Sequence, residues 1–135
     1  MIQRIQTLWL LLAAGCNAIT LLLPFYTGVK EKDVLEKVTA QSNFILLILC
    51  VAVILSSLLS IFFYKDRKKQ MMIVAIGFVL QILNIILLLK QMSAFKEGTV
   101  SLSSLFSFAV PVFFVMALIG IRKDEKLIKS MDRLR

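Results

Sequence analysis

The side chains most able to do chemistry in the apolar parts of this chain are three amides. They are Asn17, Gln81 and Asn84, and the last two are three residues apart, which places them on one face of a helix. If Asn17 and Gln81 lie at similar depths in two helices, an amide-to-amide hydrogen bond joins them, contributing about 0.6 kcal/mol in a membrane. The amides and Pro111 either line a small polar pocket or only bond neighbouring helices together, and bonding between helices is the simpler interpretation.

Catalytic chemistry has little support elsewhere in the sequence. Cys16 and Cys50 lack the C-x-x-C spacing of disulfide-exchanging enzymes, so we interpret both as buried thiols that act as small apolar side chains. The chain has no histidine, and its long apolar stretches contain no charged residue. Proton relays and ion paths in membranes usually need such charges, and catalysis needs clustered acids, bases, nucleophiles or metal ligands. We therefore expect no enzyme activity, no metal site and no cofactor.

The elements that must position these side chains are four long apolar stretches separated by short charged ones. Hydrophobic residues make up 59% of the 135 residues, whereas globular proteins typically have roughly 45–50%. Each stretch can supply the roughly 20 apolar residues that a helix needs to cross a bilayer. The sequence therefore predicts an all-α fold, an integral membrane four-helix bundle that forms one domain over residues 1–135. The predicted spans are residues 5–25, 44–64, 71–89 and 102–121, with outer loops at 27–41 and 90–101 and a tail at 122–135.

Basic residues are divided unevenly between the two ends of the predicted spans. Of the 16 lysines and arginines, eleven lie before the first span, between the second and third spans, or after the fourth, and five lie in the outer loops. Because cytoplasmic loops carry an excess of Lys and Arg, this distribution predicts that both termini are cytoplasmic. Their position also explains the net charge of +8 better than nucleic-acid binding does.

The tail has the pattern of a short amphipathic cytoplasmic helix. Leu127, Ile128, Met131 and Leu134 fall on one face, with basic residues around them. Such a helix can lie along the inner leaflet and contact anionic head groups, although docking of a cytoplasmic partner is also open. The basic candidates for lipid or partner docking are Arg122, Lys123, Lys126, Lys129 and Arg133.

Small residues recur at every fourth position in the first two predicted spans. This spacing lets helix backbones approach closely in lipid, where packing replaces the hydrophobic effect as the driving force. We favour packing inside the bundle over a dimer face. The candidate packing positions are Ala14, Ala18, Ala52, Ser56 and Ser60.

The two ends of the chain are its most distinctive segments. It opens with MIQRIQTL, continues into LLLAA, and closes with GIRKDEKL and DRLR. In these segments the chain resembles an uncharacterised family of small bacterial four-span inner-membrane proteins, a domain of unknown function, and the resemblance extends over the whole length. It implies a bacterial inner (cytoplasmic) membrane location and supports four spans, and it assigns no residue a catalytic role.

Two classes of function are compatible with these features. The leading hypothesis is a non-enzymatic multi-pass membrane protein that acts as an assembly or accessory component, in a homo-oligomer or a larger membrane complex. The alternative is a small oligomeric transporter, channel or lipid-binding protein, which predicts a cavity lined by Asn17, Gln81 or Asn84. In either case the expected partners include membrane lipids, with anionic head groups at the cytoplasmic face, and exclude nucleic acid.

Overall fold

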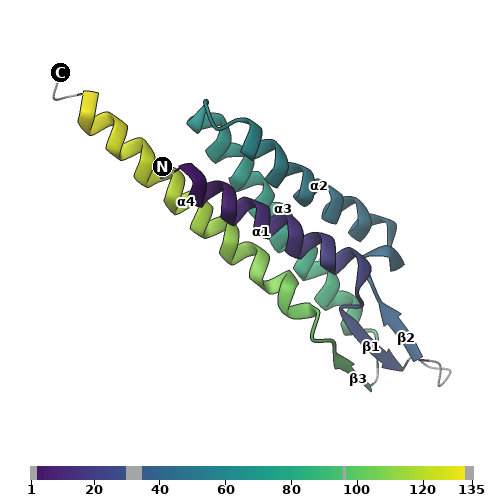
Figure 1. Ribbon diagram of the computed structural model, residues 1–135. Helices are drawn as coiled ribbons and strands as arrows, with labels where there is room; N and C mark the ends of the chain where they lie inside the picture. The colour runs from purple at the N-terminus through teal and green to yellow at the C-terminus, as the bar shows by residue number, and fades with distance from the viewer. Residues whose placement is uncertain (1–2, 30–34, 96, 133–135) are drawn as a thin grey trace.

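Four long helices run side by side and make up most of the molecule (Figure 1). The structure is a computed structural model, and it describes residues 3–29, 35–95 and 97–132. All four helices are long and apolar enough to cross a membrane, which confirms that part of the sequence prediction. They are α1 (Gln3–Leu22), α2 (Phe44–Phe62), α3 (Arg67–Met92) and α4 (Ser104–Asp132).

Each helix buries one face inside the bundle and exposes the opposite face, which is apolar as well. α1 packs against α2 and α4, and α3 packs against the same two helices, so the four form a closed ring. The outward side chains are also apolar, as Leu11 on α1 (57% exposed) and Val79 on α3 (61% exposed) illustrate. Buried positions recur mostly at steps of three or four residues, the spacing of a bundle whose helices cross at small angles. In α4 these positions are Ser104, Ser107, Val110, Phe114, Ala117, Ile121 and Asp124.

The centre of the bundle is an apolar layer in which the helices approach closely. Leu10, Val53, Val74 and Phe114 are all fully buried there, one from each helix. Gly77 on α3 faces Ser56 on α2, and a Cβ at that position would overlap the Ser56 Oγ and come within 3.1 Å of the Phe114 Cζ. A glycine at this position therefore allows α3 to lie directly against its neighbours.

One end of the bundle, which we call the sheet end, is closed by a small antiparallel sheet. It contains β1 (Tyr26–Val29), β2 (Leu35–Val38) and β3 (Glu97–Val100) in the order β2-β1-β3, and the 3-10 helix η1 (Ala40–Ser42) follows β2. The all-α prediction is therefore wrong at this end, although the chain is mostly helical. The strands form because pairing satisfies the backbone groups of loops that the helices bring together.

Tyr26 fixes the central strand of this sheet. Gly28 on β1 lies opposite Gly98 on β3, and a Cβ at Gly98 would overlap the Tyr26 hydroxyl and lie 2.6 Å from the Gly28 Cα. The Tyr26 ring meets the Phe95 ring edge to face, with centroids 5.5 Å apart. The ring thus covers two glycines, and side chains at either position would displace it.

At the opposite end, which we call the basic end, α1 begins, the turn between α2 and α3 is located, and α4 projects beyond the other helices (Figure 1). The prediction that the tail is helical is confirmed for residues 122–132, but these residues do not form a short helix of their own, because α4 continues as one helix from Ser104 to Asp132. No glycine or proline interrupts residues 121–132, so nothing in this segment ends the helix.

Candidate functional site

The interior amides bond to neighbouring helices. The Gln81 Nε2 on α3 donates a hydrogen bond to the Ser107 carbonyl on α4, at 3.0 Å. That carbonyl would normally accept from the residue four positions later, but position 111 is a proline and has no N–H. Gln81 therefore supplies the donor that Pro111 removes, and the bond ties α3 to α4.

The other two amides meet at Cys50 on α2. The Asn17 Nδ2 on α1 donates to the Cys50 carbonyl, and the Asn84 Nδ2 on α3 donates to the Cys50 Sγ, both at 3.1 Å. Asn17 and Gln81 thus bond different partners, and the predicted hydrogen bond between them is wrong, because α1 and α3 do not adjoin in the ring. Cys50 is a buried free thiol, and Cys16 is a half-buried one.

The five small packing candidates differ in burial. Ala14 on α1 and Ser56 and Ser60 on α2 are buried, Ala52 is partly buried, and Ala18 is exposed. Ser56 is the one against which Gly77 packs most closely. These positions therefore do not form one continuous stripe on either helix.

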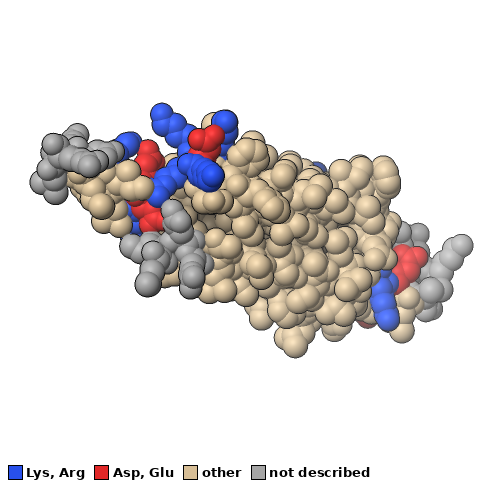
Figure 2. Space-filling view, turned by 45° about the horizontal axis from the view of Figure 1, so that its top comes forward, with Lys and Arg blue, Asp and Glu red and all other residues tan. Residues whose placement is uncertain are grey.

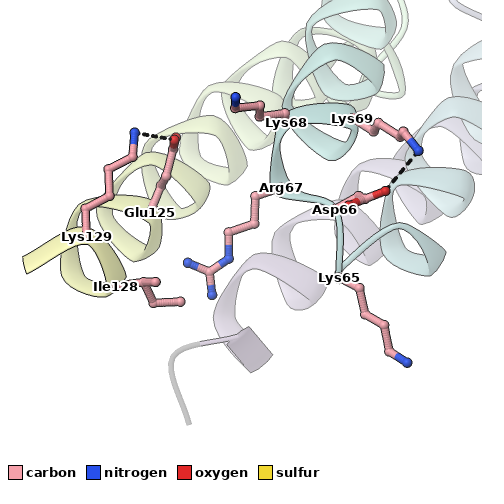
Figure 3. A pocket seen from close by; sticks show the side chains of 8 residues that line it. All are labelled: Lys65, Asp66, Arg67, Lys68, Lys69, Glu125, Ile128 and Lys129. Atoms are coloured by element: carbon pink, nitrogen blue, oxygen red, sulfur yellow. Dashed lines mark hydrogen bonds and ion pairs between the residues drawn. The ribbon is translucent and has the colours of Figure 1, made fainter. Parts of the chain in front are cut away.

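On the face that Figure 2 shows, charged side chains gather mainly at the two ends of the molecule, with a mostly uncharged surface between them. The basic end holds a cavity of about 570 Å³ between the α2–α3 turn and the projecting part of α4 (Figure 3). Two ion pairs flank it, Lys69 with Asp66 and Lys129 with Glu125, at 2.9 Å and 2.8 Å. The lining residues are Lys65, Asp66, Arg67, Lys68, Lys69, Glu125, Ile128 and Lys129.

Positive charge dominates this cavity and acts on its acidic residue in α4. The hydrogen bond from Lys129 and its charge lower the pKa of Glu125, which lies beyond the apolar section of the helix, and the charges of Lys68 and Arg67 contribute less. The Arg67 side chain extends from the start of α3 toward α4 (Figure 3). An anion entering here would meet several cations and few competing carboxylates.

A second cavity, of about 290 Å³, lies beside the first and shares Arg67 with it. Its wall includes Asp124 of α4, which is only 5% exposed and accepts a hydrogen bond at Oδ2 from the Gln6 Nε2 of α1. Within the described residues, neither the Asp124 Oδ1 nor the Arg67 Nη1 has a hydrogen-bond partner, although both atoms are buried. The remaining lining residues are Thr7, Ile61, Tyr64 and Gln70.

Comparison with known proteins identifies the family. The family described as "Domain of unknown function (DUF4293)" matches residues 2–134. The chain belongs to the DUF4293 family. No curated protein and no solved structure matches it. The resemblance to an uncharacterised family is thereby confirmed, and no activity accompanies it.

The basic candidates predicted for the DUF4293 tail have different positions in the structure. Arg122, Lys123 and Lys126 are exposed on α4, whereas Lys129 lines the larger cavity. Arg133 lies outside the described residues, as does Leu134 of the predicted apolar face. Of the predicted set, only Lys129 lines this cavity. The other lining cations are Lys65 in the α2–α3 turn and Arg67, Lys68 and Lys69 at the start of α3.

Sequence reasoning missed the buried polar residues at the basic end of the DUF4293 bundle. Gln6, Gln70 and Asp124 are each at least 94% buried, since their exposed fractions are 6%, 4% and 5%. The spacing of the buried residues along each helix is a signal that could have found them. Extending the three-and-four pattern by one step from Leu10, from Val74 and from Ile121 reaches all three positions.

Proposed function

We propose that this chain is a non-enzymatic, multi-pass protein of the bacterial cytoplasmic membrane that acts as an assembly or accessory component. Its four apolar helices cross the bilayer, and the basic end lies in the cytoplasm with both termini. The excess of lysine and arginine at that end supports this orientation.

One observation carries the proposal. Each interior amide donates to a group on an adjacent helix, while the apolar outer faces remain uncovered. Side chains that line a transport path would be expected to face a water-filled space, and these instead join α1, α2, α3 and α4 to one another. Their arrangement supports a packed scaffold whose outer surface is available for lipid and for other membrane helices.

A second candidate, a lipid-binding protein, is favoured by the two cavities at the basic end. They combine cations, one buried carboxylate and an apolar rim at the border of the apolar section. Anionic or zwitterionic head groups lie at that depth in a bilayer. Lipid binding is compatible with an accessory role, because a bound lipid can form part of a membrane assembly.

The first test concerns the membrane itself. The full chain, expressed in bacteria, should remain in the membrane fraction after an alkaline carbonate wash, and a tag on its last residue should be labelled only after the cytoplasmic side is opened. A chain that dissolves in buffer without detergent would overturn both candidates. Labelling of the tag in intact cells would overturn the orientation.

The second test concerns assembly. Native mass spectrometry of complexes released directly from membranes should detect a homo-oligomer or a second membrane protein bound to the chain. A monomer that carries only lipid would overturn the assembly role and leave lipid binding as the function.

A further inference from the structure

The wall of the smaller cavity at the basic end includes an acidic and a basic residue, and each has one buried atom that lacks a hydrogen-bond partner. The Asp124 Oδ1 and the Arg67 Nη1 both belong to residues in its wall, and neither has a hydrogen bond within the described part of the chain. A buried charged group without a partner costs several kcal/mol. The ion pairs described among residues 35–95 and 97–132 are Lys69–Asp66 and Lys129–Glu125, so Arg67 and Asp124 do not neutralise each other directly.

Gln6 holds the carboxylate of Asp124 in a fixed orientation. Its amide nitrogen donates to one carboxylate oxygen, Oδ2, and leaves the other oxygen unpaired. Gln6 and Asp124 come from the first and last helices of the ring, which lie side by side here (Figure 1). The packing of α1 on α4 therefore leaves one carboxylate oxygen of a cavity-lining residue without a donor.

Arg67 provides the complementary group. It is the first residue of α3, its side chain extends toward α4 (Figure 3), and it lines both cavities. A guanidinium at this position suits a phosphate, because its N–H groups match the geometry of phosphate oxygens. At about 290 Å³ the cavity also exceeds the space that a single bridging water needs.

We propose that this cavity binds a lipid head group that carries both a phosphate and a primary ammonium group, as in phosphatidylethanolamine. The phosphate contacts Arg67 and the ammonium donates to Asp124. The proposal rests on the membrane insertion proposed above, since it places the cavity at head-group depth. Tyr64, 51% exposed, and Ile61 form the apolar side of the wall, along which the glycerol and the first acyl carbons lie.

The chemistry separates this head group from other common ones. Phosphatidylglycerol has the phosphate and only neutral hydroxyl donors, so it cannot offset the charge of Asp124. Phosphatidylcholine has a cation without N–H groups, which cannot donate a hydrogen bond to a carboxylate. Of the three, the ethanolamine head group alone combines a phosphate for Arg67 with a positively charged N–H donor for Asp124.

The test uses the full chain, stripped of lipid in detergent and titrated with the three lipids carrying identical acyl chains. Bound lipid is measured by native mass spectrometry. We expect the wild-type chain to bind phosphatidylethanolamine about tenfold more tightly than either other lipid, the value of one charge-assisted hydrogen bond. Equal binding of all three lipids would overturn the proposal, and this comparison needs no variant.

Two variants assign the roles of the residues. Asp124→Asn should reduce the preference for phosphatidylethanolamine over phosphatidylglycerol to about twofold or less, while Arg67→Gln should weaken binding of all three lipids about tenfold. Glu97→Gln is the control, because Glu97 is an exposed acidic residue of β3 at the sheet end, away from both cavities. A control variant that loses the preference as strongly as Asp124→Asn would overturn the proposal.

A soluble compound is the other source of the same chemistry. Free O-phosphoethanolamine, added as a competitor, should displace the bound lipid only at far higher concentration, because it lacks the acyl chains. Binding of the free compound as tightly as the lipid would overturn the lipid assignment. A chain that stays in carbonate-washed membranes but shows no head-group preference would refute this inference alone, and would leave the proposed membrane function intact.

Discussion

The two ends of the bundle differ in how they satisfy their polar groups. At the sheet end, three strands pair their backbones and Tyr26 covers the glycines between them. At the basic end, a short turn joins α2 to α3, and Asp124 and Arg67 each keep one buried atom unpaired within the part of the chain that the structure describes. Both ends lie at the borders of the same apolar section.

This difference indicates that the sheet end has a structural role and that the basic end is suited to binding a ligand. Proteins rarely leave buried charges incompletely paired, and such atoms often mark binding or catalytic sites. At the sheet end, the residues mainly contact one another, as expected of a region with a structural role. Changes at the sheet end should therefore reduce stability, whereas changes at the basic end should alter binding more than stability.

The largest effect is expected at the sheet end, from Gly98→Val. The new side chain would overlap the Tyr26 ring and the Gly28 backbone, so the free energy of unfolding should fall by about 2–3 kcal/mol. Reversible unfolding in mixed micelles measures it. Thr99→Val, at the next and exposed position of β3, is the control and should change little. Equal effects of the two variants would show that the Tyr26 ring does not depend on a glycine beneath it.

A change of opposite sign is expected at the basic end. Asp124→Asn removes an incompletely paired buried charge and keeps an acceptor for Gln6, so in lipid-free detergent the free energy of unfolding should rise by about 1 kcal/mol. The same unfolding assay applies, with Asp66→Asn as an exposed control. A clear loss of stability in Asp124→Asn would contradict the contrast between the two ends.

The middle of the bundle should behave like the sheet end, with a smaller effect. Gln81→Leu removes the donor to the Ser107 carbonyl and should cost about 0.6 kcal/mol. In a Pro111→Ala background the cost should approach zero, because residue 111 regains an N–H for that carbonyl. An identical cost in both backgrounds would mean that Gln81 does not compensate for the proline.

The smallest effect concerns the pH response of the larger cavity. The Glu125 pKa should lie below its ordinary value because Lys129 bonds to and attracts the carboxylate, and Lys129→Gln should raise it. Because the folded-state pKa is lowered, the stabilisation from this pair is present above the ordinary pKa and disappears as the pH falls through the lowered one. Carboxyl NMR titration measures both values. An unchanged Glu125 pKa in the variant would exclude Lys129 as the cause.

Much of the helical architecture was predictable because its cause is local. Apolar runs of sufficient length specify the helices wherever they occur, and charges such as Lys65 and Lys69 mark where one run ends and the next begins. The sheet was not predictable in the same way. Each strand has four residues, and β1 pairs with β3 across roughly 70 positions of sequence, a distance set by two intervening helices.

The candidate site was hidden for a related reason. Asp124 stands among charged neighbours, so the sequence predicts a cytoplasmic tail helix there, and only the continuation of α4 brings Asp124 against Gln6. Likewise, the amide of Gln81 suggested a partner amide, whereas its actual acceptor is a carbonyl left free by a proline on another helix. Both relations depend on which helices are neighbours, and composition does not contain that information.

The order of strands along the chain has a consequence for biosynthesis. β1 is the central strand and follows directly after α1, but its partner β3 follows α3 and is made only after α2 and α3 have been translated. Until the ribosome has passed Val100, one edge of β1 has no β3 to pair with. The sheet is therefore completed at a late step. Its completion requires that α2 and α3 have already been inserted as a pair.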